Sequence, residues 1–257
     1  MTTFGFIGTG KIASSVIEGI NKSIFKKNKI IISKRNNKIS KKLKNKYKNI
    51  EIESDNQEII NKSDWIFLSV TPEIGKKIIK KLNFRPKSYI ISFISTIKFD
   101  DLKKMVGNNK TKIVRAIPLP PISIRKGPVP FFPPNKKIKN FFNQLGTSIE
   151  IKNEKLSNNF WATSGMMATY YEILRVLSEW LISRGINRNE AQKYITSLFL
   201  ALSQDAYNNF NKSLKDLVKE SQTPKGLNEQ GLNELTQLGI YKSIIKALNN
   251  ISKRLNK

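Results

Sequence analysis

"FGFIGTGKIASSV", residues 4–16, contains three small residues at the spacing G-x-G-x-x-A: Gly8, Gly10 and Ala13. The apolar residues 3–7 predict a strand before them, and residues 11–22 have the spacing of a helix after them. In a dinucleotide-binding β-α-β unit the first glycine permits a tight turn, the second lets the backbone approach a pyrophosphate, and the third small residue lets helix and strand pack closely. The stretch therefore favours a dinucleotide site, and a strand-to-helix turn without a ligand is the alternative.

The start of this predicted helix suits a phosphate group. A helix N-terminus offers unpaired N–H groups and a partial positive charge. Here those groups belong to Thr9, Lys11 and Ile12.

The end of the second predicted strand, residues 29–33, selects between two cofactors. An Asp or Glu there would accept the ribose hydroxyls of NAD, whereas basic residues would bind the 2′-phosphate of NADP. This chain has Ser33, Lys34 and Arg35, a hydroxyl beside two cations. We therefore predict NADP (NADPH) as the cofactor. The alternative is that Lys34 and Arg35 are ordinary surface cations in a lysine-rich chain.

Further apolar runs at residues 50–53, 64–70, 88–95 and 112–118 predict more strands, and segments with helical spacing separate them. This alternation indicates a doubly wound α/β domain. Ligands of such sheets lie at the carboxyl ends of the strands. The residues that follow two of these strands are thus further cofactor-binding candidates: Val70, Thr71, Pro72 and Ser95.

The second half of the chain has a different pattern. A proline-rich stretch at 118–134 predicts a loop with no helix and with a late edge strand near 128–132. A last strand follows within residues 141–151, and from about residue 153 the patterns are helical. We expect an N-terminal Rossmann-like doubly wound domain over residues 1–152. An all-α C-terminal domain over residues 153–257 would complete the chain, with Gly185 ending one long helix and Asn187 starting the next.

Composition excludes several kinds of chemistry. The formal charge is +27, but its lysines are spread along the chain, which favours a solvated surface over a nucleic-acid site. The chain has no Cys and no His, so thiolate nucleophiles, Ser-His-Asp triads and histidine-ligated zinc are absent, and we expect no metal site.

No apolar run reaches the length of a membrane span, and residues 1–8 lack the basic segment of a signal peptide. We expect a cytoplasmic protein.

The predicted long helices carry more apolar surface than one packed layer needs. The residues in question are Trp161, Tyr170, Tyr171, Trp180, Leu181, Tyr194, Leu198, Phe199 and Leu202. A surplus of this kind is typical of an interface between copies of a chain. We predict a homodimer, or a larger homo-oligomer built of dimers.

The order of these segments resembles the pyrroline-5-carboxylate reductase family, which reduces a cyclic imine to proline with NAD(P)H. The matching pieces are "GFIGTGKIASSVIEGI" for GFIGxGNMA, "SVTPE" for VKPQ, "ISFISTI" for SxxAGI and "VRAIPLPP" for RxMPNTP. In the helical part "TSGMMATYYEILRVLSEWLISRGINRNEAQKYI" parallels LSGSGPAYxFxxxEAxxxxGxxxGLxxxxA, and "TPKGLNEQGLNEL" parallels SPGGTTxxGLxxL. The resemblance covers nearly the whole chain.

The resemblance implies where an imino-acid substrate binds. The SPGGTT segment of the family holds the substrate carboxylate at a helix start, and the corresponding binding residues here are Thr223, Lys225, Gly226, Leu227 and Asn228. Asn228, the one catalytic candidate, would orient the imine nitrogen, and the loop could come from the partner subunit. Leu227 and Asn228 stand where the family has threonines, and Met166 replaces a small residue, so we expect a bulkier and more apolar pocket. Core packing is the alternative role for Met166.

The absence of histidine agrees with imine reduction, because an iminium is already protonated whereas ketone reduction usually requires a positioned proton donor. Two alternatives stay open. One is a divergent NADP-dependent reductase of another imine or of a carbonyl compound. The β-hydroxyacid dehydrogenases share the two-domain plan but use a Lys followed four residues later by Asn, which "SGMMATYYEIL" does not offer. The other is an NADP-binding protein without activity.

Overall fold

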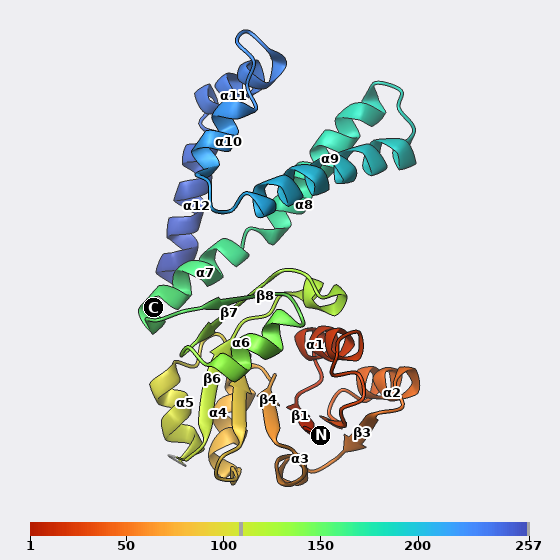
Figure 1. The fold of residues 1–257 in the computed structure, drawn as a ribbon, viewed down its shortest axis with the longest axis vertical. Helices are drawn as coiled ribbons and strands as arrows, with labels where there is room; N and C mark the ends of the chain where they lie inside the picture. Colours follow the sequence, from red (N-terminus) through yellow and green to blue (C-terminus); the bar gives the residue numbers. More distant parts are fainter. Residues whose placement is uncertain (108–109, 256–257) are drawn as a thin grey trace. The chain divides into compact units, whose positions relative to one another are not determined.

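In the computed structural model, which describes residues 1–107 and 110–255, the N-terminal part is built on an eight-stranded sheet (Figure 1). Its order is β3-β2-β1-β4-β5-β6-β7-β8, so the chain winds outward from β1 in one direction and then from β4 in the other. The pairs are parallel except for β6 with β7. The strands are β1 (Phe4–Ile7), β2 (Ile30–Ser33), β3 (Ile50–Glu53), β4 (Trp65–Leu68), β5 (Tyr89–Ser92), β6 (Lys112–Ala116), β7 (Pro128–Phe132) and β8 (Thr147–Glu150). The predicted doubly wound α/β domain is confirmed.

Helices cover both faces of this sheet. They are α1 (Lys11–Asn21), α2 (Asn37–Lys46), α3 (Asn56–Lys62), α4 (Pro72–Ile78), α5 (Phe99–Val106) and α6 (Lys136–Asn143), and the short 3₁₀ helix η1 (Ile79–Lys81) follows α4. Side-chain caps fix where α2, α3 and α6 begin. The side-chain oxygens of the N-cap residues Asn36, Asp55 and Asn135 accept N–H groups of the first turns.

Two apolar cores lie on the two sheet faces because successive strand residues point in opposite directions. Phe67 of β4 belongs to the core that also contains Val16 of α1 and Phe141 of α6. Its neighbour Ile66 belongs to the other core, with Ile59 of α3. Full burial of such side chains stabilises a fold by roughly 1.5–3 kcal/mol each.

The proline-rich segment differs from the expectation in two ways. Residues Pro120–Ile124 form a 3₁₀ helix, η2, which packs against α1 and buries Ile122. Prolines are tolerated in a first helical turn because the N–H groups there have no intrahelical partner. The predicted absence of a helix from 118–134 was therefore wrong.

Strand β7 is also not an edge strand, because β8 pairs on its outer side. The carbonyls of Gly127 and Phe131 accept N–H groups of Thr147 and Ile151 from the β8 side, at 2.9 Å each. Pro130 faces β6 instead, where its carbonyl accepts Ile117 N–H at 3.0 Å. The prolines of β7 are tolerated inside the sheet because the N–H groups they lack would face β6, where the pairing with β7 is short. The prediction of an edge strand was wrong.

The C-terminal part is helical, with α7 (Ser157–Ser164), α8 (Met167–Ser183), α9 (Arg188–Asn208), α10 (Leu214–Glu220), α11 (Leu227–Gln237) and α12 (Ile240–Leu255). In the part of the chain that the structure describes, β8 is the last strand, as predicted. Gly185, with φ +91°, follows the end of α8, and the Asn187 side chain caps α9. The predicted long helix that ends there is divided at Gly165 and Met166 into α7 and α8.

Contacts divide the chain into two compact units, Met1–Phe160 and Trp161–Lys257. The expected domains have their boundary after residue 152, ahead of the short 3₁₀ helix η3 (Glu154–Leu156). Within the second unit, α8 packs against α9 and α11 against α12 (Figure 1). Among the described helices, we find no stretch with both the length and the apolar character that crossing a membrane requires.

Candidate functional site

The turn between β1 and α1 has a geometry that only glycine satisfies at its first position. Gly8 has φ +100°, and a Cβ atom there would lie 2.3 Å from the carbonyl oxygen of Ser69. Gly10 is the N-cap of α1, and a Cβ atom there would meet no atom within 4 Å. Fold geometry therefore requires Gly8, whereas the open space over Gly10 leaves room for a ligand to approach the backbone.

Ser33 holds this turn from the adjacent strand. Its Oγ accepts the N–H of Gly8 at 2.9 Å, and its carbonyl accepts the hydroxyl of Thr9 at 3.3 Å. Ser33 and Thr9 are only 4% and 2% exposed. Ser33 thus lies at the predicted place, and its hydroxyl braces the glycine turn rather than standing open at the surface.

Two neighbouring hollows at the carboxyl ends of β1, β2 and β4 bring the predicted cofactor residues together. The first, about 290 Å³, is lined by residues that include Gly8, Ser33, Lys34, Arg35 and Val70. The second, about 440 Å³, is lined by residues that include Gly8, Thr9, Gly10, Arg35, Val70 and Thr71. Three segments far apart in the sequence therefore meet at one edge of the sheet.

The charge of this edge suits a phosphate-bearing ligand. The described residues that line the two hollows include Lys34 and Arg35, both exposed, and no carboxylate. Helix α1 begins here behind Gly10, so its first N–H groups point toward the same region. A bidentate guanidinium and a helix N-terminus are both well suited to phosphate oxygens. The residues present fit a dinucleotide phosphate.

The other cofactor candidates lie near this edge but outside the lining of the two hollows. Lys11 is exposed in the first turn of α1, and Ile12 packs against the core. Pro72 begins α4 behind the N-cap Thr71. Ser95 follows β5, where its carbonyl accepts a hydrogen bond from Arg115. Arg115 lies in the "VRAIPLPP" stretch that carries part of the resemblance, but no site role was predicted for it.

The predicted substrate loop forms the start of α11. Gly226 is the N-cap of this helix, and its N–H donates to the Thr223 carbonyl at 2.7 Å. Lys225 has φ +58°, and its N–H donates to Glu229 Oε2 at 2.6 Å. This carboxylate was missed in the sequence, although a Glu three residues after an N-cap is a known capping signal.

Two residues of this loop differ in their environments. The amide of Asn228, predicted to orient an imine nitrogen, donates from Nδ2 to the Ser221 carbonyl at 2.8 Å. Leu227 is 86% exposed. Asn228 is therefore held in place by the chain just before the loop, whereas Leu227 offers an apolar surface. Met166, the remaining substrate candidate, is half-buried at the N-cap of α8.

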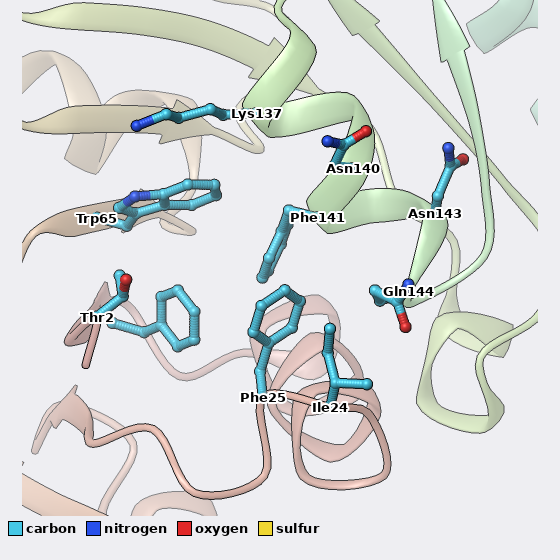
Figure 2. A pocket seen from close by; sticks show the side chains of 10 residues that line it. Thr2, Ile24, Phe25, Trp65, Lys137, Asn140, Phe141, Asn143 and Gln144 are labelled. Atoms are coloured by element: carbon cyan, nitrogen blue, oxygen red, sulfur yellow. The ribbon is translucent and has the colours of Figure 1, made fainter.

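A third hollow, about 530 Å³, lies at the opposite edge of the sheet (Figure 2). Phe4 and Trp65 begin β1 and β4, so this is the amino edge of the strands. Its rings pack on one another, with centroids 5.3 Å apart for Phe25 and Phe141 and 5.0 Å apart for Trp65 and Phe141. The hollow is the open margin of an aromatic core and is separate from the glycine turn.

Fold and glycine turn together define a dinucleotide-binding oxidoreductase with a helical second domain. Comparison with known families agrees, because residues 3–96 match a model described as NADP oxidoreductase, coenzyme F420-dependent. Residues 154–257 match a model described as pyrroline-5-carboxylate reductase dimerisation. The chain belongs to the pyrroline-5-carboxylate reductase family.

Individual relatives are similar over nearly their whole length. Pyrroline-5-carboxylate reductase of Pisum sativum is 23% identical, with 98% of this chain and 94% of that protein covered. The enzyme of Methanosarcina acetivorans is 22% identical, with 97% and 95% covered.

Solved structures show the same fold. Pyrroline-5-carboxylate reductase from Coxiella burnetii superposes with a TM-score of 0.86 at 23% identity, with 99% of this chain and 97% of that chain covered. The Plasmodium falciparum pyrroline carboxylate reductase, solved with NADP bound, has a TM-score of 0.82 at 20% identity, with coverages of 99% and 97%. The resemblance and the two-part fold predicted from the sequence are confirmed.

Proposed function

We propose that this chain reduces 1-pyrroline-5-carboxylate to proline with NADPH. The observation that carries the proposal is the meeting of the glycine turn with Ser33, Lys34 and Arg35 at one sheet edge, in a chain whose relatives match it from end to end. Family membership supports the reductase class, and the loop at Thr223–Asn228 supports a carboxylate-bearing substrate.

The cofactor would be held by backbone and cations. The open approach over Gly10 and the first turn of α1 suit the pyrophosphate, and Lys34 and Arg35 suit a 2′-phosphate. Val70 and Thr71 close the other side of the second hollow. When bound, the nicotinamide supplies a hydride.

The substrate would be held by the start of α11. The N–H groups of Leu227 and Asn228 belong to the first turn of this helix, and a helix N-terminus stabilises a carboxylate. The N–H of the N-cap Gly226 already donates to the Thr223 carbonyl. The Asn228 amide, fixed through Ser221, would orient the imine nitrogen. An iminium needs no protein acid, so the chain's task is to bind, orient and exclude water.

A homodimer would complete this assembly. The helices of the second unit expose large apolar side chains, among them Trp180 (58%), Tyr194 (62%) and Leu202 (58%). Exposed apolar surface of this extent in one unit is typical of an interface. The family model matched by residues 154–257 is named for dimerisation, which supports the same assembly.

The decisive experiment measures NADPH consumption by the purified chain with 1-pyrroline-5-carboxylate, beside bulkier cyclic imines and with NADH in place of NADPH. We expect turnover with pyrroline-5-carboxylate and a preference for NADPH. Tight NADPH binding without turnover of this substrate contradicts the proposal. Turnover of a bulkier imine would then identify a divergent reductase, a reading that the exposed Leu227 favours.

The cofactor preference is tested with a matched pair of variants. Arg35→Ala removes the guanidinium that lines both hollows, and Lys38→Ala removes a cation of α2 that lines neither. We expect Arg35→Ala to weaken NADPH binding about tenfold or more with little effect on NADH, as for loss of a bidentate charged contact. Equal changes for both cofactors, or for both variants, would show that Arg35 is an ordinary surface cation.

A further inference from the structure

An ion pair between a buried arginine, Arg115, and a partly exposed glutamate, Glu154, lies beside the carboxyl edge of the sheet, and no role was predicted for it from the sequence. Arg115, near the end of β6, is 3% exposed, and its Nη1 donates to the carboxylate of Glu154. Its Nη2 donates to the Ser95 carbonyl at 2.5 Å. The same Glu154 oxygen, Oε1, also accepts the N–H of Phe99 at 2.7 Å. Two side chains thus tie three separate segments of the first unit together.

Those segments have different roles in the chain. Ser95 lies in the loop 93–98 that joins β5 to α5, and Phe99 is the first residue of α5. Glu154 begins the short 3₁₀ helix after β8, where the neighbouring Asn153 side chain fixes the backbone by accepting Lys155 N–H at 3.0 Å. The ion pair therefore sets the position of loop 93–98 relative to β6 and to the segment that follows the last strand.

Loop 93–98 lies at the edge that carries the candidate cofactor site. β5 pairs with β4, and the N–H of Phe93 donates to the Leu68 carbonyl at 2.9 Å, just before Val70 and Thr71. Ile94 and Ile97 are buried in the core, whereas Ser95 is half-buried and Thr96 is exposed. The loop is therefore held by the buried side chains of Ile94 and Ile97 and by the hydrogen bond from Arg115 to the Ser95 carbonyl.

The geometry that the ion pair of Arg115 and Glu154 fixes explains its presence better than the stability it adds. Moving a guanidinium and a carboxylate out of water is costly, and an apolar pair of the same shape often stabilises a fold as well. Burial lowers the pKa of Arg115, and the adjacent Glu154 carboxylate opposes that effect, so the guanidinium keeps its charge. What an apolar pair could not provide is the directional bonds to Ser95 and Phe99.

We propose that Arg115 and Glu154 are positioning residues for the cofactor, holding loop 93–98 and the start of α5 where NADPH binding needs them. This inference rests on the proposed NADPH-dependent function. It assigns a role in ligand binding to a side chain, Arg115, that faces the protein interior.

The test compares two variants of this pair with a matched control. Glu154→Gln keeps the size and an acceptor oxygen but removes the charge, and Arg115→Lys keeps a charge but cannot reach Glu154 and Ser95 together. The control is Glu150→Gln, which removes a carboxylate about as accessible as Glu154, at 27% against 23%, whose partner Lys139 at 2.7 Å is exposed where Arg115 is buried. The measurements are NADPH affinity by calorimetric titration, exchange of backbone amides in residues 93–99, and the thermal midpoint of each variant.

We expect Glu154→Gln and Arg115→Lys to weaken NADPH binding about tenfold, the loss of one charge-assisted hydrogen bond, and to speed amide exchange at Phe99. Glu150→Gln should stay within about twofold of the wild type, as for a surface pair. A merely structural role would lower the thermal midpoint without changing NADPH affinity well below it. Glu154→Gln keeps the inference testable if Arg115→Lys does not fold.

The outcomes separate this inference from the proposed function. If the wild-type chain binds NADPH and both folded variants bind it as tightly as Glu150→Gln does, the positioning role is wrong. If the wild type binds NADPH but does not reduce pyrroline-5-carboxylate, the proposed reaction is wrong and the binding comparison still decides this inference. A wild-type chain that does not bind NADPH overturns both.

Discussion

The two units of this chain bury their apolar residues to very different degrees. In the first unit, strand residues such as Phe6, Phe67 and Ile90 are 0% exposed, because helices cover both faces of the sheet. In the described part of the second unit, the buried apolar residues are Ala162, Ala191 and Ile195. The first unit contains its own cores, whereas the second has long helices with little apolar surface enclosed between them.

This difference indicates that much of the apolar surface of the second unit is not covered within one chain. Large apolar side chains of α9 illustrate the point, since Tyr194, Leu198 and Leu202 are 62%, 39% and 58% exposed. A helix that is apolar on more than one face is normally buried on more than one face. The proposed homodimer would supply the missing partner surface with a second copy of the same unit.

The largest effect is expected from charging this surface. Leu198→Lys with Leu202→Lys puts two ammonium groups on one face of α9 and should raise the dimer dissociation constant about a thousandfold or more, since each buried Leu contributes about 1.5–3 kcal/mol. Sedimentation should then give the monomer mass of 29.4 kDa. The control is Gln192→Lys with Gln204→Lys, which adds the same charge at exposed polar positions of α9. A dimer that persists in the leucine variant would show that the second unit is complete without this face.

A smaller and more local effect is expected inside the first unit, from the two glycines of the turn between β1 and α1. Gly8→Ala should lower the free energy of unfolding by about 2–4 kcal/mol, because φ is +100° and the new Cβ meets the Ser69 carbonyl. Gly10→Ala should leave the thermal midpoint within a degree or two, because nothing lies within 4 Å of its Cβ. Thermal unfolding followed by circular dichroism measures both.

The two glycine variants also distinguish an effect on folding from an effect on NADPH binding. Gly10→Ala should still weaken NADPH binding about tenfold or more, since its methyl group would stand where the pyrophosphate approaches the backbone. Unchanged NADPH affinity in Gly10→Ala would contradict a cofactor role for the turn and favour the purely structural alternative.

The smallest effect concerns a half-buried carboxylate at the surface of the first unit, Glu53. The Lys62 side chain, followed by the backbone N–H groups of Asp55 and Ser54, lowers the pKa of Glu53 from 4.5 to about 2. A carboxyl group with a lowered pKa stabilises the fold above its ordinary pKa, and this contribution is lost as the pH falls from 4.5 toward 2. Glu53→Gln should therefore unfold with a shallower dependence on pH in that window, as measured by urea titrations at several pH values.

Salt provides the check on this prediction, because Glu53 and Lys62 lie at the surface and are screened. The difference between wild type and Glu53→Gln should shrink in high salt. A difference that salt does not change would mean that a cause other than the surface pair sets the acid sensitivity.

Local patterns were sufficient to predict the β-α-β unit, the glycine turn and the change to helices after β8. These features follow from residues close together in the sequence, such as the apolar run before Gly8 or the cap at Asn187. The surplus of apolar residues on the long helices also predicted the exposed surface of the second unit. Each of these features depends on residues that lie within one strand or within a few turns of one helix.

The features that local patterns missed depend on contacts between distant segments. Arg115 and Glu154 are 39 positions apart, and nothing near either residue signals the other. The position of β7 inside the sheet depends on β8, which comes later in the chain. Ser33 was placed correctly at the site, but its inward hydrogen bond to Gly8 N–H requires the register of β1 and β2.

The prolines of β7 have a mechanical consequence. β6 and β7 are in register at two residue pairs, Arg115 with Phe132 and Ala116 with Phe131, whereas β5 and β6 are in register at four. A pull applied to the C-terminal helices first loads the ion pair of Glu154 with Arg115, and once that pair breaks it reaches the sheet through β8 and then β7. Under tension the sheet should part first between β6 and β7, and the glycine turn on β1 would keep its shape after β7 and β8 have come away.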